Sequence, residues 1–518
     1  MAGWLSTMVF SSVIFVLFFM PVVLGGYFIL AAPAILGSQR KLWWRVSNLF
    51  LLISSLVFYF WGEKFLVWIV ITSTLIDYVC GLVISGGLGA GGIKPLEPDT
   101  PRSRPQKAAL AASVCSNLTF LAVFKYFNFG VDSFNHVVST LGLSALAWDD
   151  TIRITLPLGI SFYTFQSMSY TIDVYRGRVR ATRNLIDFAC YVTMFPQLVA
   201  GPIVRYRDVA EQLRTRVVGW SLFASGVSRF TIGLGKKLLI ANTVSVAAEE
   251  ILALPTAQLQ PGIAWLGIAC YTIQIYFDFS GYSDMAIGLG RMLGFTFPEN
   301  FNYPYISQSM REFWQRWHIS LSTWFRDYLY IPLGGNRRSV RRTYLNLAAV
   351  FTLCGLWHGA SWSFVVWGLY HGFFLILERA WLQDFLARRH PLVRHIYTVL
   401  VIVCGWVLFA TDSLGHAVGF WGAMFGFAGE AVTTREVEWY LTREVRMALI
   451  AGIVLSMPVR PAIADLLDRS LTRLKGAMRG TAELTLATCR MLCLCALFIL
   501  CVMFLSAGTH NPFIYFRF

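Results

Sequence analysis

The sequence predicts an all-α polytopic membrane protein, a bundle of roughly 10–13 transmembrane or re-entrant helices. Of its 518 residues, 56% are hydrophobic and 14% are charged, whereas a soluble domain carries roughly 25% charged residues. The mean hydropathy is +0.58. Because one span needs about 20 apolar residues, this composition supplies roughly ten or more spans. It excludes a soluble globular enzyme and a disordered protein.

Apolar stretches recur along the chain and are separated by basic or Gly/Pro-rich breaks. Some of the predicted helices are expected to be re-entrant or interfacial, and one run is short for a span. No internal repeat and no soluble domain of useful size is visible, so residues 1–518 are predicted to form one integral-membrane domain. The predicted helices are 8–34, 47–60, 65–86, 108–124, 154–172, 185–203, 219–248, 262–292, 344–377, 396–411, 416–428 (the short run), 446–463 and 485–507.

The first predicted helix is expected to be retained, because the apolar run from Met8 to Leu36 is too long for a signal-peptide core and follows no Lys or Arg. The loop after this helix is basic, the turn at 62–64 is nearly neutral, and the Gly- and Pro-rich loop at 86–106 is basic again. The positive-inside rule then places the N-terminus in the periplasm and the basic loops in the cytoplasm. The basic residues concerned are Arg40, Lys41, Arg45, Lys94, Arg102, Arg104 and Lys107.

The net charge of +15 is likewise attributed to basic loops between membrane-spanning helices. Short basic clusters between apolar runs are typical of membrane topology, so nucleic acid is not expected as a partner. Some of these arginines are also suited to meet the phosphates of a ligand. The further clusters are Arg176, Arg178, Arg180 and Arg183; Arg205 and Arg207; Arg337, Arg338, Arg341 and Arg342; and Arg469, Arg473 and Lys475.

The ten cysteines lie mostly inside apolar runs, and none has the spacing of a zinc site. They are interpreted as small core or lipid-facing residues. The sequence also lacks the motifs G-x-x-x-x-G-K-[ST], H-E-x-x-H and G-x-S-x-G. This argues against a P-loop pump, a zinc protease and an α/β-hydrolase.

Residues 300–335 differ from an ordinary span, because they are dense in both aromatic and charged side chains. From residue 310 the pattern predicts a helix, with a polar stripe that includes His318. One alternative is an amphipathic helix in the membrane interface, and the other is a helix that presents His318 to a cavity. The predicted aromatic face consists of Trp314, Trp317, Leu321, Trp324 and Tyr328.

His358 is the strongest candidate for a functional residue. It is the only histidine or charged side chain between Tyr344 and Tyr370. A titratable group deep in a span is costly and usually faces a cavity or a partner. The small residues around it, Gly355 and Gly359, allow close approach of a ligand or of another backbone. The alternative is a histidine satisfied by hydrogen bonds between helices.

The other histidines carry weaker signals. His318 lies forty residues from His358, so only the fold can bring the two together. His371, thirteen residues after His358, does not share its helix face and is predicted to lie at the membrane boundary with Glu378. Five histidines are expected to be solvated in or near loops: His136, His390, His395, His416 and His510.

A second polar group interrupts the apolar run 271–291. Asp278 and Asp284 are six residues apart and do not share a helix face. Two interpretations stay open. The carboxylates order a helix break near Gly281, or they bind a positive group.

Several long motifs resemble the membrane-bound O-acyltransferase family, and the similarity spans nearly the whole chain. It is weakest at about 380–500. The motifs are MVFS (Met8–Ser11), LPLGISFYTFQSMSYTIDVYRG (Leu156–Gly177), FPQLVAGPIVRY (Phe195–Tyr206), YFDFSGYSDMAIGLGRMLGF (Tyr276–Phe295), FWQRWHISLSTWFRDYLYIPLGGNR (Phe313–Arg337), GLWHGASW (Gly355–Trp362) and FIYFRF (Phe513–Phe518).

The resemblance implies a bowl-like bundle of tilted helices around a central tunnel. The two histidines of the family map onto His318 in R-W-H-I-S and His358 in W-H-G. The implied reaction is transfer of an acetyl group. Its destination in the bacterial systems that this chain resembles is an exopolysaccharide, alginate above all, with cellulose and peptidoglycan as the related alternatives.

A mechanism follows as a hypothesis. Acetyl-CoA approaches from the cytoplasm, and its phosphates meet Arg337, Arg338, Arg341 and Arg342. His318 or His358 takes the proton of an acceptor hydroxyl, and neither a bound cofactor nor a metal is required. Because the chain has no external hydrolase-like domain, a periplasmic acetyltransferase is expected as its partner. The competing classes are a transporter that uses His and Asp as a proton relay and a non-catalytic scaffold.

Overall fold

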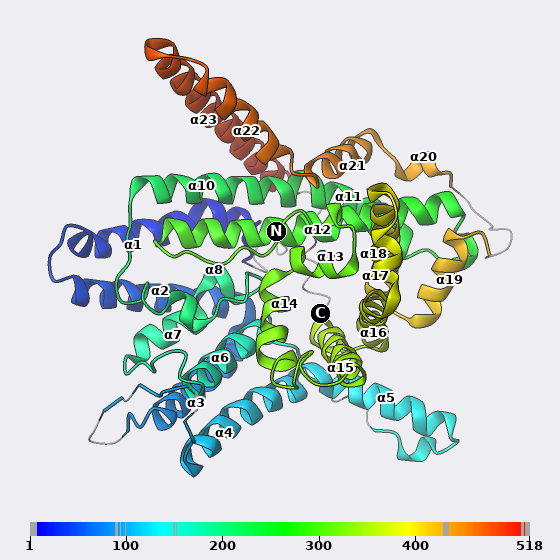
Figure 1. The fold of residues 1–518 in the computed structure, drawn as a ribbon, viewed down its shortest axis with the longest axis horizontal. Helices are drawn as coiled ribbons and strands as arrows, with labels where there is room; N and C mark the ends of the chain where they lie inside the picture. The colour runs from blue at the N-terminus through cyan, green and yellow to red at the C-terminus, as the bar shows by residue number, and fades with distance from the viewer. Residues whose placement is uncertain are drawn as a thin grey trace. The chain divides into compact units, whose positions relative to one another are not determined.

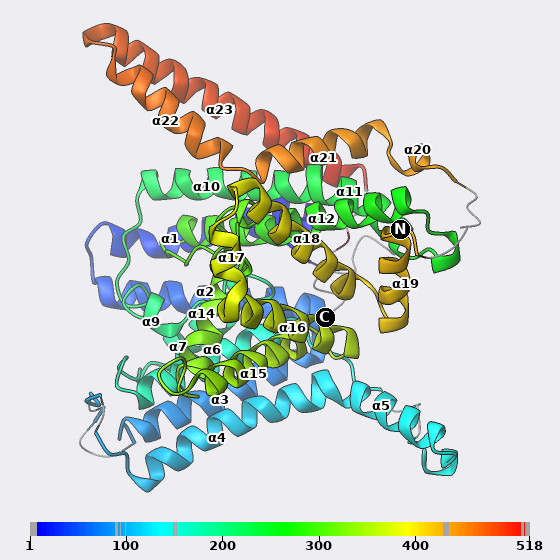
Figure 2. The same cartoon turned by 45° about the vertical axis from the view of Figure 1, so that its right-hand side comes forward.

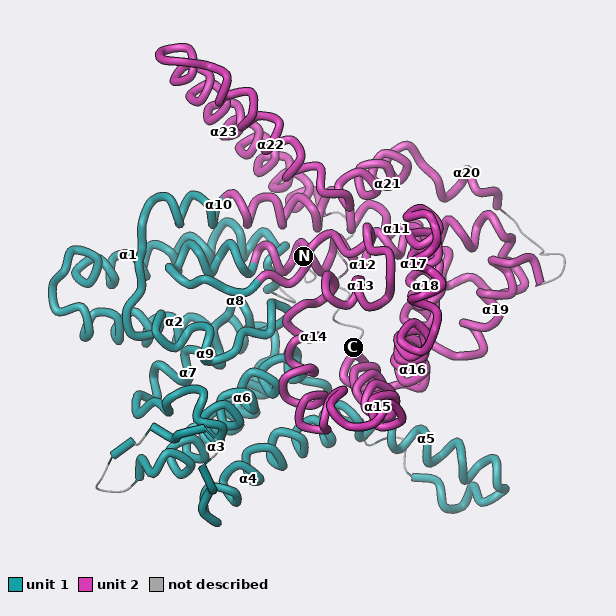
Figure 3. The backbone as a smooth tube through the Cα atoms, in the orientation of Figure 1, with its two compact units in different colours: residues 1–227, 286–298 teal, residues 228–285, 299–518 magenta. Residues whose placement is uncertain are grey.

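The computed structural model describes residues 8–88, 92–93, 95–98, 100–148, 151, 153–427, 435–508 and 512. Regular structure in these residues is entirely helical, which confirms the predicted all-α class. The chain divides into two compact units, shown in different colours in Figure 3. Unit 1 comprises residues 1–227 and 286–298, and unit 2 comprises residues 228–285 and 299–518.

Unit 1 is built mainly from the first nine α-helices. The helix α1 packs on α2, α2 on α7, and α3 on both α4 and α6 (Figure 1). The helices are α1 (Met20–Ile35), α2 (Arg40–Glu63), α3 (Val67–Ile84), α4 (Arg104–Leu121), α5 (Phe127–Thr140), α6 (Ile160–Tyr175), α7 (Leu185–Thr193), α8 (Phe195–Leu198) and α9 (Tyr206–Val209).

A buried carboxylate joins three helices of unit 1. Asp77 of α3 is fully buried. It accepts hydrogen bonds from Ser113 Oγ at 2.5 Å and from Asn117 Nδ2 at 2.8 Å, both on α4. Ser167 of α6 donates to the same carboxylate. Because each donor comes from a neighbouring helix, the cluster fixes how α3, α4 and α6 pack.

Unit 2 contains the remaining helices, and α10 and α12 contribute residues to both units. The helix α15 packs along α16, and α22 runs beside α23 (Figure 2). The helices are α10 (Trp220–Gly235), α11 (Asn242–Leu252), α12 (Pro261–Met292), α13 (Met310–Arg316), α14 (Ile319–Phe325), α15 (Val340–His358), α16 (Trp362–Leu377), α17 (Gln383–Ala387), α18 (Pro391–Ala410), α19 (Leu414–Met424), α20 (Val437–Tyr440), α21 (Arg443–Leu455), α22 (Val459–Thr472) and α23 (Gly476–Ser506).

Short π-helical and 3₁₀ segments extend or link several of these helices. The π-helical segments are Phe15–Phe19, Ala122–Tyr126, Lys236–Ala241, Arg326–Tyr330 and Glu378–Leu382. The 3₁₀ segments are Lys64–Leu66, Ser144–Leu146, Thr256–Gln258 and Pro304–Ile306. A π-helical turn inside an α-helix frequently accompanies a functional site. Here Arg326–Tyr330 follows α14, and Glu378–Leu382 follows α16.

Glycines allow two helix pairs of unit 2 to touch through their backbones. A Cβ atom at Gly355 of α15 would lie 2.2 Å from the carbonyl oxygen of Phe364, and one at Gly368 of α16 would lie 2.1 Å from that of Phe351. In the same way, a Cβ atom at Gly281 of α12 would lie 2.8 Å from the Gly233 oxygen of α10. Only glycine permits such close approach.

The predicted alternative of a helix break near Gly281 is therefore wrong. The helix α12 runs without interruption from Pro261 to Met292. Gly281 serves close packing against α10 and does not end the helix.

Five helical runs of the described residues are long and apolar enough to cross a membrane. They become six if the pair α21 and α22, bent by 61°, counts as one broken span. The five runs are Phe15–Ile35, Arg40–Ile84, Arg104–Thr140, Pro391–Ala410 and Gly476–Ser506. Several other predicted spans carry buried polar side chains that lower their hydropathy, as in α6 with Thr164, Gln166 and Ser167. The predicted number of spanning or re-entrant helices stays a prediction.

The single domain of residues 1–518 also stays a prediction. In the predicted loop 86–106, helix α4 begins at Arg104 with a capping box of Ser103 and Gln106. Some sequence features lie outside the described residues, namely Met1–Ser6, Lys94, His510 and Phe513–Phe518.

Candidate active site

The first element of the site is a sharp break at His318. The predicted continuous helix from residue 310 is wrong, because α13 ends at Arg316 and α14 starts at Ile319. His318 lies between them with φ 43° and ψ 55°, in the left-handed region that is rare for non-glycine residues. Such a conformation persists only where the surroundings hold it.

Asn300 supplies what holds this break. Its backbone oxygen accepts the amide of Ile319 at 2.9 Å. Its side-chain oxygen lies 3.1 Å from His318 Nδ1 and accepts the backbone amide and the hydroxyl of Ser320 at 3.2 Å and 2.8 Å. Its Nδ2 donates to Ser283 Oγ of α12 at 3.1 Å. A loop 18 residues upstream thus replaces the hydrogen bonds that a continuous helix would make.

The five side chains predicted to form an aromatic face are all buried, at 0–8% exposure: Trp314, Trp317, Leu321, Trp324 and Tyr328. An exposed interfacial helix is therefore excluded for this face, and His318 itself has 0% exposure.

His358 is the last residue of α15 and is 5% exposed. Its ring is surrounded by aromatic side chains from three helices. The ring centroids lie 4.9 Å from Trp357, 5.0 Å from Trp367 of α16 and 5.3 Å from Phe409 of α18. This enclosure excludes bulk water and strengthens electrostatic interactions at the ring.

The fold brings the two histidines together. The ring centroids of His318 and His358 are 6.3 Å apart, at an interplanar angle of 63°. The rings of Trp357 and Phe279 also pack against His318, at centroid distances of 5.8 Å and 4.7 Å. Two buried titratable rings from separate elements therefore face one small region, as an acid–base site requires.

His371 is fully buried on α16. Its predicted place at the membrane boundary stays a prediction. Trp367 packs on His371 at 4.8 Å and Trp314 at 5.3 Å. The same Trp367 ring contacts His358, so a tryptophan lies between His371 and the pair. Of the histidines expected to be solvated, His136 and His390 are exposed, whereas His395 and His416 are half-buried.

Glu378 supports the His318 break from the other side. It follows α16, and its carboxylate accepts the backbone amides of Met310 at 2.6 Å and Arg311 at 3.1 Å. These are the first two residues of α13. The Tyr397 hydroxyl donates to the same carboxylate at 3.2 Å. A carboxylate at a helix N-terminus satisfies unpaired amides and interacts favourably with the helix dipole.

The acidic pair of α12 takes the second of its two predicted roles. Asp278 forms an ion pair with Lys237 at 2.6 Å. Asp284 lies 2.7 Å from Lys236 and 2.6 Å from Arg229. The carboxylates therefore bind positive groups of the same chain, and this network ties α12 to α10 and the segment after it.

The four arginines predicted to meet a donor lie at the opposite end of α15. Arg337, Arg338, Arg341 and Arg342 are all exposed. Ser339 caps the helix there and accepts the amide of Arg342 at 3.2 Å. Between Arg341 and His358 the helix rises by about 26 Å, at roughly 1.5 Å per residue. The arginines therefore lie near the start of this helix, whereas His358 lies at its other end.

Comparison with known proteins identifies the fold family. A sequence model of the MBOAT, membrane-bound O-acyltransferase family matches residues 56–411. This chain belongs to that family. The match contains both histidines and the elements that hold them.

Similar proteins cover the full length of this acyltransferase. The probable alginate O-acetylase AlgI of Pseudomonas putida is 41% identical and covers 99% of this chain and 100% of its own. The protein of the same name from Pseudomonas aeruginosa is 46% identical over 81% of this chain and 75% of its own. The peptidoglycan O-acetyltransferase of Helicobacter pylori is 31% identical over 99% and 98%. The chain is thus a membrane O-acyltransferase related to alginate O-acetylase.

Two hollows of the acyltransferase adjoin the His318 break. One has a volume of about 490 Å³ and includes Arg311, Arg326 and Cys354 in its lining. The other has a volume of about 850 Å³ and includes Tyr276, Asp284 and Phe301. Ile319, the residue after His318, lines both. Among the described residues, no group of three or more His, Cys, Asp or Glu is arranged to hold a metal ion.

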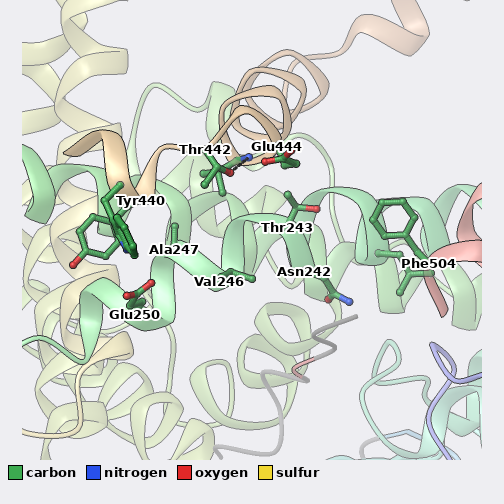
Figure 4. A pocket seen from close by; sticks show the side chains of 12 residues that line it. Asn242, Thr243, Val246, Ala247, Glu250, Tyr440, Thr442, Glu444 and Phe504 are labelled. Carbon is green, nitrogen blue, oxygen red and sulfur yellow. Dashed lines mark hydrogen bonds between the residues drawn. The ribbon is translucent and has the colours of Figure 1, made fainter. Parts of the chain in front are cut away.

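A third hollow of about 360 Å³ lies beside α11, α20 and α21. Its lining contains no histidine, and its Glu250 is paired with Arg435. It therefore offers no acid–base pair like that of the two histidines. Figure 4 labels its polar and apolar walls, including Asn242, Thr243, Val246, Ala247, Thr442 and Glu444.

The sequence did not point to Asn300 or Glu378 as parts of the site. Asn300 opens the unusual stretch 300–335 as one polar residue before a run of aromatics. Nothing in local spacing indicates that its amide meets a residue 18 positions later. The sequence predicts Glu378 at the membrane boundary with His371, because a carboxylate at the end of an apolar run usually lies there.

Proposed function

We propose that this acyltransferase moves an acetyl group from a cytoplasmic donor, acetyl-CoA, across the inner membrane for O-acetylation of an exopolysaccharide, namely alginate. The observation that carries the proposal is the buried pair His318–His358, with ring centroids 6.3 Å apart. The full-length similarity to proteins named alginate O-acetylase supports the choice of polymer. The Helicobacter pylori relative, named for peptidoglycan, is less similar.

The pair supplies a general base and a second polar ring. A neutral imidazole takes the proton of an acceptor hydroxyl as its oxygen attacks the thioester carbonyl. The C–S bond breaks, and the thiolate of the donor leaves and is protonated. The other histidine positions a substrate or stabilises the oxyanion. A covalent acyl-histidine is the alternative route through the same residues.

The donor is expected to enter from the cytoplasmic side, where Arg337, Arg338, Arg341 and Arg342 attract its phosphates. Their exposure at the start of α15 supports an electrostatic role. A donor that touches both regions has to extend over about 26 Å, at roughly 1.5 Å of rise per helical residue. The basic loops then face the cytoplasm and the N-terminus faces the periplasm.

A periplasmic acetyltransferase is expected to receive the acetyl group and pass it to the polymer. In the described residues, regular structure consists of helices of the two units, without a separate hydrolase-like domain. The chain would then act as the membrane half of a modification complex. Its direct acceptor is a hydroxyl of that partner or of the polymer.

The test is reconstitution of the full chain in lipid vesicles with acetyl-CoA labelled in its acetyl group. Transfer of label to a partner protein or to deacetylated alginate on the far side of the membrane is the expected result. Vesicles with cellulose or peptidoglycan fragments as acceptors test the choice of polymer. Passage of intact donor into the vesicle without any transfer of label would contradict the proposal and favour a transporter.

A further inference from the structure

We infer that Asn300 is a positioning residue that fixes the ring tautomer of His318, with the proton on Nδ1 and the lone pair on Nε2. The inference rests on the proposed function only for its consequence in catalysis. The tautomer itself follows from the hydrogen bonds around one amide group. It places the lone pair of the His318 ring, the atom that can accept a proton, at Nε2.

The orientation of the Asn300 amide is determined by its neighbours. The backbone amide of Ser320 can only donate, and it points to one side-chain atom of Asn300 at 3.2 Å. That atom is therefore the oxygen. The other side-chain atom then is the nitrogen, which donates to Ser283 Oγ at 3.1 Å. Both ends of the amide agree on the same orientation.

The amide orientation decides the tautomer. Nδ1 of His318 lies 3.1 Å from the same oxygen. If Nδ1 carried a lone pair, two lone pairs would face each other at hydrogen-bond distance. The neutral ring therefore carries its proton on Nδ1, which donates to Asn300, and its lone pair lies on Nε2.

This arrangement suits a ring that accepts a proton. When Nε2 takes a proton, the ring becomes positive, and the bond from Nδ1–H to the amide oxygen strengthens. A titratable ring, that of His358, lies 6.3 Å from the His318 ring, and the rings of Phe279 and Trp357 also pack against His318. Asn300 is 1% exposed, so little water competes for the bond.

The side chain can be tested separately from the backbone. The oxygen that holds the left-handed turn by accepting the amide of Ile319 is the main-chain oxygen of Asn300, and it survives any substitution. Asn300→Leu keeps this main-chain bond and removes the side-chain bonds to His318, Ser320 and Ser283. Asn300→Asp keeps an acceptor oxygen toward Nδ1. Asn346→Leu is a matched control, because Asn346 of α15 is also buried and its amide donates to the oxygens of Leu333 and Gly335, which precede that helix.

The first experiment measures the tautomer directly. The full chain is labelled with ¹⁵N-histidine in lipid, and His318→Gln assigns the signal of His318. The wild-type ring is expected to be protonated at Nδ1 and unprotonated at Nε2. A proton on Nε2 in the neutral wild-type ring would overturn the inference, whether or not any variant folds.

The second experiment follows acetyl transfer. Asn300→Leu is expected to lower kcat by about 10- to 100-fold with a small change in KM, because a buried hydrogen bond to a reacting group is lost. Asn300→Asp is expected to restore the tautomer and to move the acid limb of the pH–rate profile to higher pH, because a carboxylate stabilises the imidazolium. Asn346→Leu is expected to leave both the tautomer and the profile unchanged.

The two experiments separate this inference from the proposed function. An unchanged tautomer and kcat in Asn300→Leu would overturn the positioning role. The expected tautomer in a chain that transfers no acetyl group would support the positioning role and contradict the proposed function.

Discussion

Asp77 in unit 1 and His318 in unit 2 are both buried ionisable side chains, but their surroundings differ. Asp77 accepts hydrogen bonds from Ser113, Asn117 and Ser167, which come from two neighbouring helices. His318 lies against one amide oxygen, the ring of Phe279 and the ring of His358. Polar groups that satisfy one another stabilise a core, whereas two titratable rings that face each other are suited to proton transfer.

The largest expected effect tests the histidine side of this comparison. The double variant His318→Ala, His358→Ala is expected to lose acetyl transfer by at least about 10²–10⁴-fold, the typical contribution of general acid–base catalysis. Membrane insertion is expected to be intact. The measurement is labelled acetyl transferred per folded chain in vesicles.

His371→Ala is the matched control for that loss, because it also removes a buried imidazole. It is expected to retain transfer per folded chain, since Trp367 lies between His371 and the pair. Full polymer acetylation by the double variant would rule out the mechanism.

The second prediction tests whether the buried Asp77 cluster stabilises the fold without a part in acetyl transfer. Asp77→Ala leaves several buried donors without their acceptor and is expected to lower the free energy of unfolding by about 1–3 kcal/mol. Thermal unfolding in detergent measures this, with the milder Asp77→Asn as the control. Transfer per folded chain is expected to stay constant. A loss of acetyl transfer at unchanged stability would show that Asp77 has a role in the reaction, like His318, and not only in stability.

Glu378 tests a structural contact close to the histidine pair, because its carboxylate accepts the first two backbone amides of α13. Glu378→Ala removes the acceptor at the start of α13 and is expected to cost about 0.5–2 kcal/mol, as the loss of a helix cap does. Glu378→Gln keeps one acceptor oxygen and is expected to recover part of that stability. Equal unfolding temperatures for wild type and Glu378→Ala would contradict the capping role.

The smallest effect concerns the arginines at the start of α15. Replacing one of Arg337, Arg338, Arg341 or Arg342 by Gln is expected to raise KM for acetyl-CoA by about 1.5- to 5-fold, because an exposed ion pair contributes roughly 0.2–1 kcal/mol. The change should fade at high salt. Arg469→Gln, on another exposed helix, is the control. An unchanged KM at low salt would contradict a role in donor binding. The arginines would then serve only to set the orientation of the chain in the membrane.

Much of the fold class could be predicted from composition and periodicity. Low charge content indicates a membrane protein, and the three- and four-residue spacing singles out Trp314, Trp317 and Trp324, which are buried. His358 could be singled out because no other charged or histidine side chain lies near it in its apolar run. These features depend on local sequence, so a single chain reveals them.

The features that sequence did not reveal depend on distant contacts. The break at His318 requires the oxygens of Asn300, and helical spacing contains no sign of them. The close approach of α10 at Gly281 gives that glycine a packing role, although a glycine between polar residues resembles a break. His371 follows the pattern of a boundary residue, yet tryptophans from two elements bury it.

The interlocked glycines of α15 and α16 have a consequence for motion. Because Gly355 and Gly368 place backbone against backbone, neither helix can slide past the other by a residue without a collision. His358 is therefore held by a rigid pair of packed helices. His318, in contrast, lies in the turn between two seven-residue helices. We expect any conformational change that admits a substrate between the two rings to move the His318 segment, while His358 stays in place.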